Sequence, residues 1–132
     1  MKYLLDTNIV FDMLRNPMGR VFRAIECVGA GNVVTSIIVL AEVRFGIAKK
    51  RSERLARQLS AVLAGLEVLP WETPMDEIYG NLRADLEHKG TPISENDLLI
   101  AAHALAHGYT LVTADEREFG RVSKLKIQNW LR

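Results

Sequence analysis

The chain has 132 residues, enough to bury the core of one domain, and we expect a single domain over residues 1–132. Hydrophobic residues make up 48% and charged residues 25%, and the net charge of +1 excludes a chain that is strongly basic or acidic overall. No apolar stretch approaches the roughly 18 residues that a membrane span needs. Asp6 interrupts the only early apolar run, so no signal peptide is expected either, and a cytoplasmic location follows.

The first half of the chain alternates short apolar runs with segments of helical periodicity. In order, the expected elements are a strand at 2–6, helices at 7–15 and 21–28, a strand at 32–36, and helices at 37–50 and 52–64. Gly29 and Gly31 are expected to stop the second helix. Ser36 is placed to cap the third, because its hydroxyl can accept a bond from the first helical turn.

The second half continues the same alternation. Its expected elements are a strand at 66–70, helices at 73–89 and 95–107, a strand at 109–113, a short turn or helix at 115–119, and a strand at 126–130. Pro74 fits the first turn of a helix, Ser94 fits a cap, and Gly108 fits a helix end. Strands that alternate with helices predict an α/β fold of three layers, α/β/α, with a short and mostly parallel central sheet.

Four acidic residues lie close to one expected edge of this sheet. In parallel α/β sheets, ligands bind outside the carboxyl ends of the strands. Asp6 ends the first strand, and Asp115 comes two residues after Thr113 of the fourth. Glu42 lies about two turns into the helix that follows the second strand, and Asp97 lies in the first turn of the helix that leads to the fourth. Four acids from four distant places are therefore expected to converge.

Such a cluster is unfavourable without a cation. Two carboxylates about 4 Å apart repel by roughly 4 kcal/mol at an effective dielectric near 20. Three or four of them raise one another's pKa values unless a positive ion neutralises them. Oxygen ligands without His or Cys suit Mg²⁺ or Mn²⁺, and carboxylates that hold such ions commonly serve to cut phosphodiesters.

Each acid also has a local explanation. Asp6 fits a helix cap, and Asp97 completes an S-x-x-D capping pattern. Glu42 fits a solvated position at the edge of the buried face of its helix, and Asp115 fits a turn. The hypothesis of a shared site therefore rests on the common position of the four acids at one sheet edge.

Other chemically active residues are weaker candidates. Cys27 lies in an apolar run and is expected to be a buried, inert thiol. His103 and His107 are four residues apart, a spacing that can bind a metal, but no third ligand accompanies them. The basic run 49–57 is expected to be a solvated helix junction, with contact to RNA backbone or a protein partner as the alternative.

Three segments together resemble the PIN-domain ribonucleases, and among them the VapC toxins of bacterial toxin–antitoxin pairs. They are MKYLLDTNIV at the start, TSIIVLAEVRFGI in the middle and ISENDLLIAAHALAHGYTLVTADEREF near the end. The resemblance covers nearly the whole chain, including the late LKIQNW. The ordered set of LDTN, S-x-x-x-x-x-E, NDLLIAAHAL and LVT-x-D is specific, and it implies a PIN domain.

The resemblance assigns the acidic residues of the family to Asp6, Glu42 and Asp97, with the more variable fourth position at Asp115. Many relatives have an Asn pair where this chain has Ala114 and Asp115, so Asp115 is either a direct ligand or acts through water. We expect the first three to bind one Mg²⁺ or Mn²⁺ firmly. The polar residues expected to hold carboxylates or waters are Thr7, Asn8, Thr113 and, with a weaker match, Ser36.

The resemblance implies a Mg²⁺- or Mn²⁺-dependent endoribonuclease toxin that cleaves structured RNA, most often tRNA in the anticodon loop, and thereby inhibits translation. In-line hydrolysis is expected to leave a 5′-phosphate and a 3′-hydroxyl. The resemblance also implies a homodimer and a VapB-like antitoxin that lays a peptide across a groove. Four residues would suit that docking, although core packing is the preferred interpretation of each: Met13, Met18, Val21 and Phe22.

Two alternatives remain open at the level of sequence. One is a non-catalytic PIN module that binds RNA or a protein, in which the acids would be remnants. The other keeps the enzyme but makes it a FitB-like partner of a DNA-binding protein. The presence of all four acids favours a nuclease over the first alternative.

Overall fold

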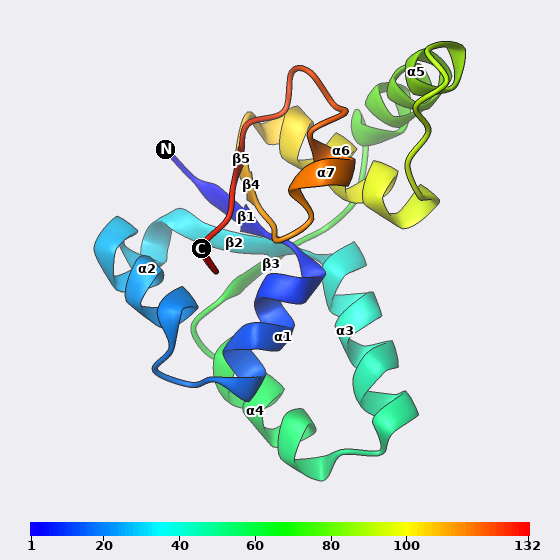
Figure 1. Ribbon diagram of the computed structural model, residues 1–132. Helices are drawn as coiled ribbons and strands as arrows, with labels where there is room; N and C mark the ends of the chain where they lie inside the picture. The colour runs from blue at the N-terminus through cyan, green and yellow to red at the C-terminus, as the bar shows by residue number, and fades with distance from the viewer.

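The computed structural model describes residues 1–132 and is built on one sheet of five strands (Figure 1). The strands are β1 (Tyr3–Leu5), β2 (Val33–Ser36), β3 (Glu67–Leu69), β4 (Thr110–Val112) and β5 (Ile127–Gln128). Their order across the sheet is β3-β2-β1-β4-β5, and every neighbouring pair is parallel. The expected sheet is thus confirmed and is parallel throughout, and the first strand of the chain lies at its centre.

Helices cover both faces of the sheet. They are α1 (Thr7–Arg15), α2 (Arg20–Val28), α3 (Ile37–Lys50), α4 (Glu53–Leu63), α5 (Met75–His88), α6 (Glu95–His107) and α7 (Glu116–Phe119), with a 3₁₀ turn at Ala30–Asn32. Figure 1 shows α1, α3 and α4 together on one side of the strands and α5 and α6 on the other, which confirms the three-layer α/β/α fold. None of the helices is long and apolar enough to cross a membrane.

Buried strand residues form the centre of the core. Leu4, Leu5, Val34, Leu111 and Val112 are almost wholly buried. Consecutive strand residues are buried because both faces of a parallel sheet are covered by helices, which explains why the strands read as continuous apolar runs. The strands are shorter than the expected ranges, since pairing extends over only two to four residues of each apolar run.

Capping residues set the helix boundaries, as the sequence predicts at Ser36 and Ser94 and allows at Asp6, whereas Ser52 is a cap where the sequence placed a helical residue. Side chains of Asp6, Ser36, Ser52 and Ser94 accept bonds from backbone N–H groups in the first turns of α1, α3, α4 and α6. Gly108 ends α6 at a φ of 67°, a conformation that favours glycine. The helices therefore begin and end close to where the sequence predicts.

Helices α1 and α3 lie close together where Phe11 meets Gly46. A side chain at Gly46 would begin 2.5 Å from the ring of Phe11, so the ring lies directly against the backbone of α3. A Cβ at Gly46 would therefore displace the far end of the Phe11 ring. One turn before Gly46, the Glu42 side chain of α3 accepts a hydrogen bond from Thr7 at the start of α1.

Three side chains differ from the sequence-based expectation. Cys27 is exposed, because it lies roughly 200° around α2 from Ile25, which packs on the core. Met18 is 78% exposed in the turn between α1 and α2, so the prediction that it packs in the core is wrong. Met13 and Val21 are buried as expected. Pro74 is the N-cap of α5 rather than a residue of its first turn.

Candidate active site

The acidic residues meet at the point where the strand order reverses. From β1 the chain builds β2 and β3 on one side of the sheet and then returns to build β4 and β5 on the other. The connections after β1 and β4 consequently diverge, which opens a crevice at the carboxyl ends of these two strands. Asp6 directly follows β1 and Thr113 directly follows β4, so both lie at this crevice.

Asp6 is the most buried acid of the cluster, at 3% exposure. One carboxylate oxygen accepts a bond of 2.7 Å from the backbone N–H of Thr7, and the other accepts a bond of 2.7 Å from the hydroxyl of Thr113. Burial raises the pKa of Asp6 to about 6; the two bonds oppose this rise, and the charges of Glu42 and Asp115 add to it. Asp6 is therefore both the cap of α1 and a member of the cluster.

Glu42 is joined to Asp6 through Thr7. The Thr7 hydroxyl donates to Glu42 Oε1 at 2.8 Å while the Thr7 backbone N–H donates to Asp6. The side-chain amide of Asn96 donates to the other oxygen of Glu42 at 3.3 Å. Thr7 thus orients two carboxylates at once, and Asn96 brings the start of α6 to the same place.

Asp115 is joined to Asp6 through Thr113. The backbone N–H of Asp115 donates to the Thr113 hydroxyl at 3.0 Å, and this hydroxyl donates to Asp6. Asn8 supports the same turn, because its side-chain oxygen accepts from the backbone N–H of Ala114 at 3.2 Å. Three of the four polar residues expected to support the carboxylates therefore contact the cluster or its turn.

The tightest group of acids contains a residue that the sequence reasoning missed. Oxygens of Asp97, Asp115 and Glu118 all lie within 4.8 Å of one another. Asp115 caps α7 by accepting from the backbone N–H of Glu118 at 3.2 Å, which turns Glu118 toward Asp97. The signal in the sequence was an acid three residues after a capping Asp, a spacing that places both side chains on one helical turn.

Asp97 and Glu118 behave as a carboxyl–carboxylate pair. Burial, the hydrogen bond and charge of Glu118, and the charge of Asp6 together raise the pKa of Asp97 to about 8. The pKa of Glu118 is lowered, chiefly by the hydrogen bond from Asp97 and also by the backbone N–H of Ser94. Without a cation, Asp97 thus holds a proton that it shares with Glu118.

These residues fit a divalent cation. Asp97, Asp115 and Glu118 offer three carboxylate oxygens close together, with no His or Cys among them, which suits a hard ion such as Mg²⁺ or Mn²⁺. Burial is the main cause of the raised pKa values of Asp6 and Asp97, and the charges of neighbouring carboxylates add to it. A bound cation would replace the proton on Asp97 and lower both pKa values.

Ser36 faces a different partner. Its hydroxyl accepts from the backbone N–H of Ile38 at 3.1 Å and lies 2.7 Å from Nδ1 of the buried His103. Burial lowers the pKa of His103 to about 4, and the charge of His107 contributes, so its imidazole is neutral near pH 7. The pair joins the end of β2 to the middle of α6 inside the core and not at the acidic cluster.

We expect Ser36→Ala to destabilise the fold by about 1–3 kcal/mol while leaving Mn²⁺ binding by the folded chain within about twofold of wild type. The alanine leaves Nδ1 of His103 buried without a partner, in a ring whose Nε2 already has none. Urea unfolding measures the loss of stability, and Mn²⁺ titration well below the unfolding midpoint measures binding at the acidic cluster. A stable Ser36→Ala chain with strongly reduced Mn²⁺ binding would instead assign Ser36 to the site.

The chain matches known proteins along almost its full length. The PIN-domain family model matches residues 3–125. A ribonuclease VapC2 of Rickettsia felis is 39% identical over 132 residues, and a tRNA(fMet)-specific endonuclease VapC of Salmonella typhimurium is 31% identical over 131, with 98% of each chain covered in both cases. A crystal structure of VapBC2 from Rickettsia felis, bound to a DNA fragment from its promoter, superposes with a TM-score of 0.89 at 38% identity, covering 98% of this chain and 99% of the other.

The match to the family model covers residues 3–125, and the fold and the acidic cluster are consistent with it. The chain belongs to the PIN-domain family. Within that family it is of the VapC type, as the resemblance of its motifs implies.

Proposed function

We propose that this chain is an endoribonuclease that hydrolyses RNA phosphodiesters with the help of a divalent cation. The observation that carries the proposal is the convergence of Asp97, Asp115 and Glu118 within 4.8 Å, together with Asp6 and Glu42, which both accept hydrogen bonds from Thr7. The names of its relatives support the reaction class. The finer proposal is an Mg²⁺- or Mn²⁺-dependent toxin that cuts structured RNA, with tRNA as the first candidate because one relative is named for it.

The chain's own residues would divide the work. Asp97, Asp115 and Glu118 would hold the cation, which lowers the pKa of bound water and stabilises charge on the scissile phosphate. Thr7 and Thr113 hold Asp6 and Glu42 in fixed orientations through four hydroxyl or backbone bonds to and from the cluster. Fixed carboxylates need no rearrangement when the phosphate arrives, which is the usual source of such rate enhancement.

A non-catalytic RNA- or protein-binding module would have no need for this arrangement. Thr7 donates to both Asp6 and Glu42, Thr113 donates to Asp6, and Asp97 lies close enough to Glu118 for that neighbour to raise its pKa further than burial alone. Such repulsion is retained in folded proteins mainly where chemistry requires it. The nuclease is therefore the proposal that the geometry favours.

Sequencing of RNA ends after brief induction of the chain alone tests the proposal and names the substrate. We expect one or a few cut sites that bear 5′-phosphates and that vanish in a matched culture expressing Asp6→Asn. Titration of the purified chain with Mn²⁺ should show binding that weakens at least tenfold in Glu118→Gln. Unchanged RNA ends together with no Mn²⁺ binding would reject the nuclease in favour of a binding module.

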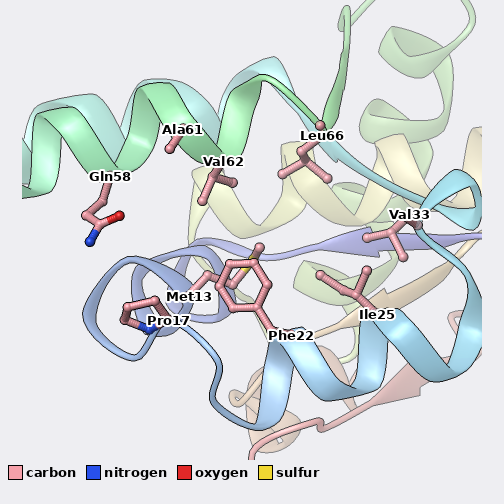
Figure 2. Close-up of a pocket in the computed structure, with 11 residues that line it drawn as sticks. Met13, Pro17, Phe22, Ile25, Val33, Gln58, Ala61, Val62 and Leu66 are labelled. Atoms are coloured by element: carbon pink, nitrogen blue, oxygen red, sulfur yellow. The ribbon is translucent and has the colours of Figure 1, made fainter.

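We also propose a VapB-like partner, which would dock on an apolar groove between α1, α2 and α4. Figure 2 shows side chains of these helices directed into a cavity of about 360 Å³. Met13, Phe22, Ile25 and Val62 supply apolar walls, and Gln58 is the main polar side chain of the lining. The complex solved for the Rickettsia relative supports this type of partner, and an amphipathic helix is the segment that such a groove suits.

The homodimer implied by the resemblance stays a prediction, which sedimentation of the purified chain measures.

We expect Ala61→Glu to abolish antitoxin binding while leaving RNA cleavage unchanged. Ala61 is exposed at the groove, so a carboxylate there is tolerated by the free chain and is buried only when a partner covers it. Ser60→Glu on the same helix is the matched control, because Ser60 is exposed but does not line this groove. Co-purification with the proposed VapB-like partner measures binding, and equal loss in both variants would refute the assignment of the groove.

A further inference from the structure

A second cavity lies on the other side of the molecule, between α5 and the segment after α7. It has a volume of about 480 Å³. Its floor is apolar and includes Ile78, Leu82 and Val122, whereas its rim carries cations. We call this cavity, with its rim residues Lys89, Arg121 and Lys124, the basic cleft.

The rim of the basic cleft has excess positive charge. The Lys89 ammonium is paired with Asp85 at 2.9 Å, and Arg121 donates through one nitrogen to the carbonyl of Pro92 at 2.8 Å. Lys124 makes no hydrogen bond or ion pair, and all three cationic side chains are exposed. Three cations and one acid leave a net charge of +2 on a rim within a chain whose total is +1. Most of the free donors of Arg121 and Lys124 are thus available to an anion.

The basic cleft adjoins the acidic cluster. Arg121 follows Glu118 by one turn, and its backbone N–H donates to the Glu118 carbonyl at 3.1 Å. The connection before α6 contacts both places, because Pro92 accepts from Arg121 while the backbone N–H of Ser94 donates to the Glu118 carboxylate at 2.8 Å. A polymer with one phosphate at the acidic cluster would therefore pass the cationic rim within its next nucleotides.

We propose that the basic cleft binds the RNA substrate on one side of the scissile phosphate, with Arg121 and Lys124 on its phosphates and the apolar floor against a base. This inference rests on the proposed function, since it assigns a substrate contact to the same site. Arginine and lysine donors recognise phosphate oxygens, and nucleobases stack on apolar or aromatic surfaces, so both layers of the cleft match single-stranded RNA.

RNA binding by fluorescence anisotropy tests the proposal. A labelled single-stranded RNA is titrated against chains that carry Asp6→Asn, so that no cleavage intervenes. On this background we expect Lys124→Glu and Arg121→Gln each to weaken binding roughly tenfold and to reduce the salt slope by about 0.7, the value for one lost phosphate contact on a single strand. Arg23→Glu on α2 is the matched control, because Arg23 is exposed and distant from both sites, and it should change affinity less than twofold.

Three results would overturn the proposal. If Lys124→Glu and Arg121→Gln both leave the affinity for RNA unchanged, the basic cleft does not contact the RNA. If Arg23→Glu loses as much RNA affinity as the variants of the basic cleft, the loss reflects the overall charge of the chain and not a contact in the cleft. Loss of self-association or of antitoxin binding in Lys124→Glu, with RNA affinity intact, makes the cleft a protein interface. Failure of the nuclease proposal looks different, since it appears as absent Mn²⁺ binding and absent cleavage by the wild-type chain.

Discussion

Asp97→Asn should lower RNA cleavage on the order of a thousandfold and leave the melting temperature equal to wild type or higher. Removing one carboxylate from the cation site removes several kcal/mol of transition-state stabilisation, and each 1.36 kcal/mol is a factor of ten in rate. Loss of activity with gain of stability identifies a residue that is kept for chemistry and not for folding.

The stability half of this prediction follows from the environment of Asp97. Its pKa is raised to about 8, first by burial and then by Glu118, so at pH 7 the side chain is mostly neutral and Asn imitates that form. An Asn amide can donate to Glu118 as the protonated carboxyl does. The folded state holds this proton up to a pKa of about 8, whereas the unfolded state loses it near 3.8, so wild-type stability falls between about pH 4 and pH 8. The Asn variant has no such loss, so its advantage should grow across this window and level off above pH 8.

Cleavage of the mapped RNA and thermal unfolding by circular dichroism, both on purified chains, measure the two halves. Asp76→Asn is the matched control, because it makes the same substitution at an exposed acid in the first turn of α5. It should change neither property appreciably. Undiminished cutting by Asp97→Asn would defeat the proposed mechanism, and a large loss of stability would recast Asp97 as a structural residue.

The metal-free chain should lose stability as pH rises from about 4 to about 6 because of Asp6. The folded pKa of about 6 lies above the ordinary value of 3.8, mainly because of burial. The folded state therefore holds the proton more tightly than the unfolded state, so this stabilisation is present below pH 4 and is lost as pH passes 6. The difference of about two units corresponds to about 3 kcal/mol. Asp97 extends the loss toward pH 8.

His103 works in the opposite direction over part of this range. Its folded pKa of about 4 lies below the ordinary 6.5, so the unfolded state binds the proton first and stability rises with pH between about 4 and 6.5. The contributions of Asp6 and His103 to the pH dependence of stability partly cancel in the wild-type chain. The difference between wild type and Asp6→Asn isolates the acid, because His103 contributes equally to both chains.

Mg²⁺ should reverse the effect of pH. Cation binding needs deprotonated carboxylates, so the rise in melting temperature on adding Mg²⁺ should be small near pH 5 and large near pH 8. A ligand at a hundred times its dissociation constant adds about 2.7 kcal/mol of stability. Thermal melts in EDTA and in saturating Mg²⁺ across this range measure it. A Mg²⁺ shift that is independent of pH, or equal in Asp97→Asn, would contradict a carboxylate site.

Much of the fold could be predicted because local signals and tertiary packing agree. Caps at Asp6, Ser36 and Ser94 and the stop at Gly108 mark helices that pack against the sheet. The exposure of Cys27 was not predicted, because only one side chain of α2 is almost wholly buried. The short apolar run around Cys27 therefore did not indicate which face of the helix would be buried. Periodicity fixes which residues share a face only when enough of them are buried.

The acidic cluster was predictable in outline and less so in its bonds. Strand ends indicated Asp6 and Asp115, but the proximity of Glu118 to Asp97 depends on how α7 packs against the start of α6. That packing joins residues 24 apart in sequence and has no periodic signature. Ser36 shows the reverse case, because its position at a strand end suggested the site while its hydroxyl turns inward to His103.

The central position of β1 has a consequence for the order of synthesis. Asp6 is made almost first, yet the hydroxyl that holds it comes from Thr113 and the strand beside it is β4. A ribosome must therefore translate more than four-fifths of the chain before Asp6 has the neighbouring strand and the hydroxyl that hold it. The acidic cluster is complete only once Glu118 has also been made, so any chemistry that it supports belongs to the nearly finished chain.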